Sequence, residues 1–234
     1  MLAIVQRGYG APRQVLEPAE LDRPGVGDED VLIRLRATSV NTPDWATVTG
    51  VPYLLRLRSG LRQPSVAVRG TDIAGTVAAV GRDVTDLRPG DAVFGSSWTG
   101  TPDDGGTFAE FAVVPAARLI KKPDGLTFEE AAASVMSGLT ALSAIRDVGE
   151  AGPGTRVLVN GASGGVGTFS VQIAKALGAE VTGVCSTRNV ELVRSLGADH
   201  VIDYTVQDVT RSDQRYDVIL DNVLNHSPSK TARL

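Results

Sequence analysis

The chain has 234 residues, a formal net charge of -4 at pH 7 and a sequence pI near 5.2. Its length favours one or two domains, and an acidic balance without a basic block argues against nucleic acid or an acidic membrane surface as a principal partner. The single cysteine, Cys185, excludes an internal disulfide and a cysteine zinc cage. Without a recognisable export signal or a membrane-length apolar stretch, the sequence predicts a cytoplasmic protein.

Residues 1–123 are expected to form a β-rich first domain, because short apolar runs alternate there with Gly, Pro and Asp turns. In residues 31–37, Ile33 and Leu35 share one face while Arg34 and Arg36 share the other, which is the period of a half-buried strand. The strand candidates are 3–6, 31–40, 75–80, 92–94 and 108–114.

The segment at residues 41–45 interrupts this pattern and is followed by an apolar stretch between Val51 and Leu61. Two interpretations are open. The stretch either forms a substrate-facing flap or packs as a local hydrophobic cluster with Trp45 and Tyr53 as anchors.

From residue 124 onward the pattern changes to alternating helices and strands, which predicts a second domain over 124–234 with a parallel, doubly wound sheet. Thr127 and Glu130 are spaced as a capping box for its first helix. Strands are expected at 156–160, 180–185, 200–203 and 217–221, with helices up to about 177 and near 189–196. The fold class is therefore α/β.

A glycine-rich turn lies between the first of these strands and its helix, and reads Ala162-x-Gly164-x-x-Gly167 after Gly161. Glycines let a backbone approach a pyrophosphate closely, and the following helix presents free N–H groups and its positive end. The turn predicts a dinucleotide site. The alternative is a glycine turn that only packs a strand against a helix.

The sequence ends soon after the fourth strand of this domain, whereas dinucleotide-binding folds usually have six. In the usual strand order the fourth strand would lie at an uncovered edge. Ser227 and Pro228 are typical of a helix start. We expect a fragment or a natural truncation.

Five ordered segments together resemble the zinc-independent quinone oxidoreductase branch (zeta-crystallin-like) of the medium-chain dehydrogenase/reductases. These segments are 40–44, 70–75, 88–95, 161–167 and 196–204, so the resemblance covers essentially the whole chain. It implies a GroES-like domain followed by an incomplete doubly wound Rossmann domain, and NADPH-dependent reduction of quinones or activated alkenes.

Zinc alcohol dehydrogenases of the same superfamily need a cysteine near position 41 and His-Glu near 71, because catalytic zinc takes thiolate and imidazole ligands. This chain has Asn41 and Thr71-Asp72 there, and its only histidines, His200 and His226, have no cysteine partner nearby. No metal site is expected.

The residues after the second strand of the Rossmann domain indicate which nicotinamide cofactor binds. An acidic residue there would hold the ribose 2′-hydroxyl of NAD, but the chain has Ser186, Thr187 and Arg188. Two hydroxyls and a guanidinium can donate to a 2′-phosphate, which favours NADPH. The alternative is that Arg188 is only a solvated residue near a helix start.

The resemblance also implies roles for individual residues. Asn41 and Tyr53 would border the hydride-transfer pocket, and either would polarise a quinone or α,β-unsaturated carbonyl held between the domains, with the final proton coming from solvent. The cofactor-binding set would be Thr140, Gly161, Ser163, Gly164, Gly165, Val166, Gly167, Ser186, Thr187, Arg188, Tyr204 and Asn222. Family members often dimerise, so a homodimer is one expected assembly. The alternative function is a truncated, non-catalytic NADP-binding or structural remnant of the family.

Overall fold

A computed structural model describes residues 1–99, 106–211, 214–225 and 227–231, without the side chains of Arg58, Pro228 and Thr231. The chain forms two units, Met1–Met136 and Ser137–Leu234. The division lies within helix α4 (Phe128–Leu142), which begins shortly after the domain boundary predicted at 123.

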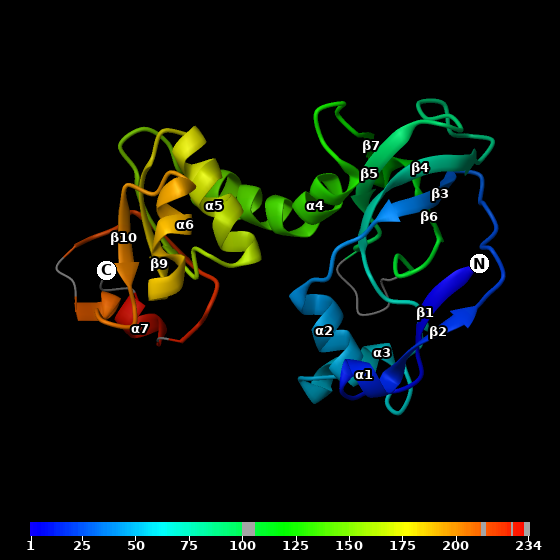
Figure 1. Ribbon diagram of the computed structural model, residues 1–234, viewed down its shortest axis with the longest axis horizontal. Coiled ribbons are helices and arrows are strands. Elements are labelled where there is room, and N and C mark those ends of the chain that lie inside the picture. The colour runs from blue at the N-terminus through cyan, green and yellow to red at the C-terminus, as the bar shows by residue number, and fades with distance from the viewer. Residues whose placement is uncertain (100–105, 212–213, 226, 232–234) are drawn as a thin grey trace. The chain divides into compact units, whose positions relative to one another are not determined.

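The first unit contains a five-stranded antiparallel sheet of order β6-β3-β4-β5-β7 and a two-stranded antiparallel pair, β1-β2 (Figure 1). The strands are β1 (Leu2–Gln6), β2 (Leu16–Glu20), β3 (Asp30–Ala37), β4 (Asp72–Val80), β5 (Ala92–Ser96), β6 (Phe111–Pro115) and β7 (Leu119–Lys121). The alternation predicted for residues 33–36 of β3 is confirmed, because Ile33 is buried and Leu35 partly buried while both arginines are exposed. The sequence prediction lacked β2 and β7.

Short helices complete the first unit. They are α1 (Pro12–Val15), α2 (Thr42–Thr49) and α3 (Arg56–Ser59), with 3₁₀ turns at Tyr53–Leu55 and Ala116–Arg118. Figure 1 shows α1, α2 and α3 gathered together, and α1 contacts α2. Trp45 and Tyr53 remain 53% and 72% exposed, so they are not the buried anchors that one interpretation of this stretch required.

Helix α2 begins where the sequence suggested only an interruption. Asn41 is its N-cap, a proline lies in its first turn, and the Asp44 carboxylate accepts the Asn41 backbone N–H at 2.7 Å. Gly50 ends the helix in the left-handed region, with φ of 66°. These are ordinary start and stop signals for a helix.

Helix α4 has the predicted capping box. The Thr127 backbone N–H donates to Glu130 Oε2 at 2.8 Å, and the Glu130 N–H donates to Thr127 Oγ1 at 3.1 Å. The helix continues into a π-helical turn, Ser143–Val148. Two of the backbone N–H groups that a helix start leaves unpaired are thereby satisfied.

The second unit has a parallel four-stranded sheet of order β10-β9-β8-β11, which is the predicted doubly wound arrangement. Its strands are β8 (Arg156–Asn160), β9 (Glu180–Cys185), β10 (His200–Asp203) and β11 (Val218–Asp221). Its remaining helices are α5 (Gly165–Ala176), α6 (Val190–Ser195) and α7 (Pro228–Thr231), with 3₁₀ turns at Thr187–Asn189 and Val209–Arg211.

Apolar side chains cover both faces of this sheet. Helix α5 packs against β8 and β9, and α6 packs against β9 and β10 (Figure 1). Val157, Val159 and Val181 belong to the larger core cluster, and Leu158 and Val184 to a second one. Burial on both faces explains the continuous apolar runs that predicted these strands. No helix in the described part of the chain is long and apolar enough to cross a membrane.

Candidate functional site

The glycine turn follows directly from the carboxyl end of β8. Gly161 has a φ of +80°, a region that side chains disfavour. The N–H groups of Gly161 and Ala162 both donate to Val184 O, at 3.1 and 3.0 Å, and the Gly164 N–H donates to Gly161 O at 3.0 Å. The turn is thus closed on itself and tied to β9.

Gly167 allows the turn and helix α5 to meet. A Cβ at this position would lie 2.1 Å from Gly161 O and 2.8 Å from the Ala162 Cα, both backbone atoms. Backbone cannot give way as a flexible side chain can, so a larger residue would push the helix away from the turn. The glycine therefore fixes where the start of α5 lies relative to β8.

The start of α5 presents unpaired backbone donors. The bond from the Thr168 N–H to Gly164 O, at 2.9 Å, is the first of the i to i−4 type. The N–H groups of Gly165, Val166 and Gly167 therefore have no acceptor within the helix. Gly164 and Gly165 are exposed, and the helix dipole adds positive potential at this end. A pyrophosphate fits this cradle, because it supplies only acceptors and negative charge.

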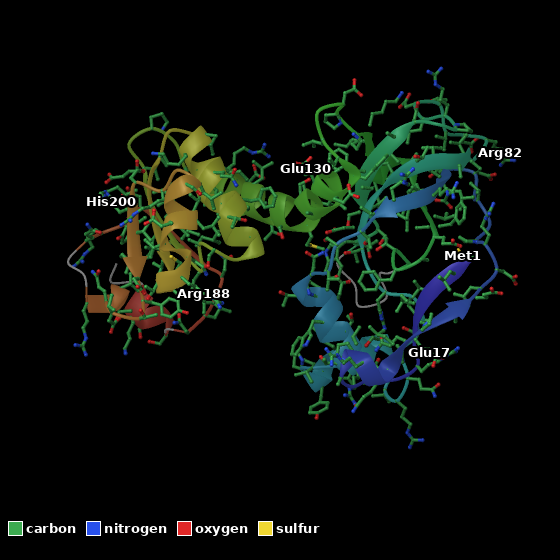
Figure 2. The ribbon with its side chains drawn as sticks, viewed as in Figure 1. Met1, Glu17, Arg82, Glu130, Arg188 and His200 are labelled. Carbon is green, nitrogen blue, oxygen red and sulfur yellow. The ribbon has the colours of Figure 1, made fainter. Side chains whose placement is uncertain are left out.

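The other predicted phosphate donors follow the end of β9. Ser186 is half-buried, whereas Thr187 and Arg188 are exposed. Figure 2 labels Arg188 and His200 near opposite ends of the sheet, which agrees with their positions after β9 and at the first residue of β10. Arg188 thus lies at the carboxyl-end side of the strands, where doubly wound folds bind their ligands.

The Thr187 hydroxyl is already engaged. Thr205 Oγ1 donates to Asp203 Oδ1 at 2.7 Å, and Thr187 Oγ1 lies 2.8 Å from Thr205 Oγ1. Because Thr205 gives its hydrogen to the carboxylate, Thr187 must give its own to this cluster. Hydrogen bonds from Thr187 and Thr205 hold the pKa of the Asp203 carboxyl below its usual range. As positioned here, Thr187 has no hydrogen left for a phosphate.

The Asn189 side chain joins the glycine turn to the end of β9. Its Nδ2 donates to Ser163 Oγ at 3.0 Å and to Ser186 Oγ at 3.3 Å. Ser163 lies in the turn and Ser186 immediately after the strand, and all three residues are half-buried. One amide therefore sets the spacing of two predicted cofactor-binding serines.

Other predicted cofactor residues lie around the same end of the sheet or on α4. The Asn222 backbone N–H and side-chain Nδ2 both donate to Asn160 O, at 3.2 Å. The Tyr204 N–H donates to Cys185 O at 3.1 Å, and its side chain is 59% exposed. Thr140 lies on α4 and is exposed. The cofactor-binding roles of these residues stay predictions.

A second polar centre lies in the first unit, around buried Asp72. Ser39 Oγ and Asn41 Nδ2 both donate to Asp72 Oδ2, the latter at 2.8 Å, and Asn41 Nδ2 also donates to Ser39 Oγ at 3.0 Å. Burial raises the pKa of the Asp72 carboxyl, opposed by hydrogen bonds from Ser39, Asn41 and the Met136 backbone. Burial also raises the pKa of Asp44.

These contacts affect the two predicted catalytic residues differently. Both hydrogens of the Asn41 amide are spent on Ser39 and Asp72, so the amide has no remaining donor for a substrate carbonyl. The Tyr53 ring is 72% exposed and lies under the Arg56 guanidinium, 4.7 Å from the ring centroid. The catalytic roles of Asn41 and Tyr53 stay predictions.

Among the described residues, no group of three or more His, Cys, Asp or Glu side chains could hold a metal ion. His200 Nε2 lies 3.0 Å from Glu180 Oε1, both about half exposed, and His226 lies outside the described residues. Positions 41 and 71 carry amide and hydroxyl oxygen donors, which are poor ligands for zinc.

Sequence reasoning missed several residues of both centres. Asn189 carried no expectation from the sequence, because one of its two serine partners, Ser163, lies 26 residues away. Asn160, which donates to Asp221 Oδ1 at 2.8 Å, was treated only as a strand end. Asp72 was considered only as a missing zinc ligand, and nothing near it in the sequence indicated its partners 31 and 33 residues away.

Two family models match the chain. Residues 27–124 match the alcohol dehydrogenase GroES-like domain, and residues 165–232 match a model described as zinc-binding dehydrogenase. The first match covers most of the β-rich unit, and the second begins within the glycine turn. They agree with the order of domains that the sequence predicted.

Curated relatives match most of the chain. Quinone-oxidoreductase QR1, chloroplastic, from Triphysaria versicolor is 34% identical over 232 residues, or 94% of this chain and 67% of the relative. Trans-enoyl reductase pgmF from Aspergillus terreus is 40% identical over 206 residues, or 85% of this chain and 56% of the relative. The chain thus spans between about half and two thirds of the length of these relatives.

Solved structures share the fold. The quinone oxidoreductase from Coxiella burnetii has a TM-score of 0.87 at 31% identity, covering 95% of this chain and 68% of that one. The Escherichia coli quinone oxidoreductase complexed with NADPH has a TM-score of 0.77 at 26% identity, covering 90% and 60%. Both likenesses cover most of the described residues.

Proposed function

Because the chain belongs to the medium-chain dehydrogenase/reductase superfamily, with quinone oxidoreductases among its relatives, we propose that it transfers hydride from NADPH to a quinone or an α,β-unsaturated carbonyl without zinc. The two acceptor classes correspond to relatives named as a quinone oxidoreductase and as a trans-enoyl reductase. The family is one of nicotinamide-dependent oxidoreductases, and the acceptor class is the part that experiment must decide.

The closed glycine turn carries this proposal. Three backbone N–H groups at the start of α5 have no intrahelical acceptor, and the exposed backbone of Gly164 and Gly165 leaves a ligand room to approach. The missing Cβ of Gly167 keeps these donors close to the end of β8. Gly161, Gly164, Gly165, Val166 and Gly167 would hold the pyrophosphate.

The choice of NADPH over NADH rests on the residues after β9. Ser186 and Arg188 can donate to a 2′-phosphate, and no acidic residue stands there to accept from a ribose 2′-hydroxyl. Thr187 contributes less than its sequence position suggested, because its hydroxyl hydrogen is used by Thr205 and Asp203. The E. coli structural neighbour is itself described as complexed with NADPH.

The residues near positions 41 and 71 support the proposal of zinc-free chemistry. A catalytic zinc site would need thiolate or imidazole ligands, where this chain has Asn41 and Thr71. The Asp72 carboxylate nearby accepts hydrogen bonds from Ser39 and Asn41. Ser39, Asn41 and Asp72 are therefore better suited to hydrogen bonding with one another than to coordinating zinc.

The bound cofactor would supply the hydride, and the protein would bind, orient and exclude water. Of the two predicted catalytic residues, Tyr53 is favoured as the donor to the acceptor oxygen, because the Asn41 amide hydrogens are committed to Ser39 and Asp72. Asn41 would instead hold the start of α2 in place. The final proton would come from solvent.

Calorimetric titration with NADPH, combined with an assay of NADPH oxidation against a panel of quinones and enones, tests the proposal. We expect saturable binding and acceptor-dependent oxidation that Tyr53→Phe slows. Tyr216→Phe, which removes a hydroxyl bonded to the exposed Gln214 side chain, should leave the rate within about twofold. Binding without turnover would support the non-catalytic alternative. Absence of NADPH binding would refute the oxidoreductase and the NADP-binding remnant, and would leave the structural remnant.

Besides the cofactor, the expected ligands are small apolar acceptors. The chain is also expected to form a homodimer and to be cytoplasmic. Both the dimer and the compartment stay predictions. Sedimentation analysis with and without NADPH would decide the oligomeric state, and a single species at the monomer mass would count against the dimer.

A further inference from the structure

The half-buried amide of Asn189 stands between two serines that come from different elements. Its Nδ2 lies 3.0 Å from Ser163 Oγ in the glycine turn and 3.3 Å from Ser186 Oγ after β9. The Asn189 backbone N–H also donates to Ser186 O at 2.9 Å, which closes the 3₁₀ turn around the amide. Main chain and side chain thus hold this residue in one position.

We propose that Asn189 is a positioning residue that orients the hydroxyls of Ser163 and Ser186 as a pair of donors for phosphate oxygens, and thereby sets the preference for a 2′-phosphorylated dinucleotide. The inference rests on the proposed function and deepens it. Asn189 need not touch the cofactor, since it acts through the two serines.

The orientation follows from the hydrogen-bonding capacity of a hydroxyl. Each serine has one hydrogen to give, and its oxygen can accept. Because the Asn189 amide fills an acceptor position on each oxygen, neither serine hydrogen can point at that amide. Both hydrogens are therefore left for another acceptor, next to the exposed backbone of Gly164 and Gly165.

A phosphate benefits from this arrangement more than a hydroxyl does. Phosphate oxygens only accept hydrogen bonds, and a bond to a charged group is stronger than one between neutral groups. A ribose 2′-hydroxyl can both give and accept, so it gains little from a site that offers only donors. Orientation of the serines should therefore affect NADP more than NAD.

The other candidate donors in this region make the amide more important. The Thr187 hydroxyl is used by the cluster with Thr205 and Asp203. Apart from the serines, Arg188 is then the remaining predicted donor to a 2′-phosphate. The Arg188 side chain is exposed, so water and salt weaken its attraction for a phosphate. Two oriented hydroxyls would supply directional binding that an exposed guanidinium does not.

Asn189→Asp tests the inference with almost no change of shape. A carboxylate accepts but cannot donate, so it would draw both serine hydrogens inward and add a negative charge. Gln172→Glu is the matched control, since it makes the same charge change on exposed α5, where the Gln172 amide donates only to Thr168 O. The dissociation constants of NADP⁺ and NAD⁺ are measured by calorimetry, independently of turnover.

We expect Asn189→Asp to weaken NADP⁺ binding by on the order of a hundredfold, from two lost bonds to a charged group, and NAD⁺ binding by less than about threefold. The control should change both by less than about twofold. Equal weakening of both cofactors, or no change in either, would overturn the inference while leaving the proposed function standing. If the unaltered chain bound neither cofactor, the proposed function itself would fail.

A second variant covers the case in which Asn189→Asp does not fold. Ser186→Ala keeps the amide and removes one oriented hydroxyl, and we expect it to weaken NADP⁺ by about tenfold with little change for NAD⁺. Where both single variants fold, the double variant should lose less than the product of the two effects, because Asn189 acts through Ser186. Strictly multiplicative losses would contradict that route.

Discussion

The two polar centres of this protein are built in opposite ways. In the second unit, the glycine turn offers backbone N–H groups outward and has little side-chain chemistry of its own. In the first unit, the donors of Ser39 and Asn41 point inward to a buried carboxylate. The glycine turn therefore has donors left for the proposed anionic ligand, whereas the Asp72 centre uses its hydrogen bonds within the protein.

The centres should also respond differently to pH. Residues 161–167 include no titratable side chain, so the proposed affinity for pyrophosphate would depend on geometry and on the dipole of α5. Asp72 and Asp44 both have a pKa raised by burial. Their charged forms are therefore a cost to the folded first unit at neutral pH.

Gly167→Ala is expected to have the largest effect, because it alters the backbone of the glycine turn itself. Alanine favours a helix interior over glycine, but its Cβ would lie 2.1 Å from Gly161 O. We expect a loss of about 1–3 kcal/mol in the free energy of unfolding of the second unit. NADP⁺ affinity should fall roughly a hundredfold as the backbone donors move. Chemical denaturation and calorimetry measure the two effects.

Gly152→Ala is the control for that experiment, because a Cβ at Gly152 meets no atom within 4 Å. It should leave cofactor affinity unchanged. If Gly167→Ala bound NADP⁺ as well as the unaltered chain, the turn would be shown to work through something other than its backbone geometry.

Substitution of Asp72 should give the next largest effect, in the first unit. Asp72→Ala leaves the donors of Ser39 and Asn41 without their acceptor, at a cost of about 1–3 kcal/mol in the free energy of unfolding. Asp72→Asn keeps an oxygen acceptor and removes the charge. Denaturant titrations of both variants between pH 3 and pH 8 measure this difference.

The pH dependence of the asparagine variant follows from the direction of the pKa shift. A raised folded pKa gives stability that is fully present below the unfolded value of about 3.9 and is lost as pH rises through the folded value. Asp72→Asn should therefore gain stability relative to the unaltered chain as pH rises above about 4. Exposed Asp124→Asn, the control, should show no such trend, and a parallel profile for Asp72→Asn would contradict the account.

The smallest effect is expected at the start of α4, the helix within which the two units divide. Thr127→Ala removes the bond from the Glu130 N–H and should cost about 1 kcal/mol. Hydrogen exchange should show faster opening near residues 128–131 than in β8 or β9. Glu129→Gln, at an exposed neighbour, is the control, and equal acceleration in both units would show that they open together.

The second unit was more predictable than the first for a physical reason. Strands β8 and β9 are buried on both faces, so their apolar runs and the glycines between them carry the signal locally. Strand β2 contains Pro18, and its structure depends on pairing with β1, from which helix α1 separates it in the sequence. Strand β7 has three residues, too few for a period to show.

The sites differ in the same way. Gly161, Gly164 and Gly167 could be predicted to form a tight turn between a strand and a helix because the motif is contiguous. The start of α2 could have been found from Asn41 and Asp44, which have the spacing of a capping box. The carboxylate of Asp72 could not, because its partners come from another strand end and only the folded sheet brings them together.

The absence of a side chain at Gly183 limits how this protein could be redesigned. A Cβ at Gly183 would lie 2.5 Å from Val193 Cγ1 on α6 and 3.0 Å from the Ala162 Cβ in the glycine turn. Helix α6 and the glycine turn therefore meet over the same face of β9, in the space that a side chain at Gly183 would fill. Residues 186–189 directly precede α6. Replacing them alone with the residues of a relative would place new side chains on an α6 that is packed differently in that relative. An exchange with a relative should therefore include the whole segment from β8 to α6, because the turn, β9 and α6 pack closely around Gly183.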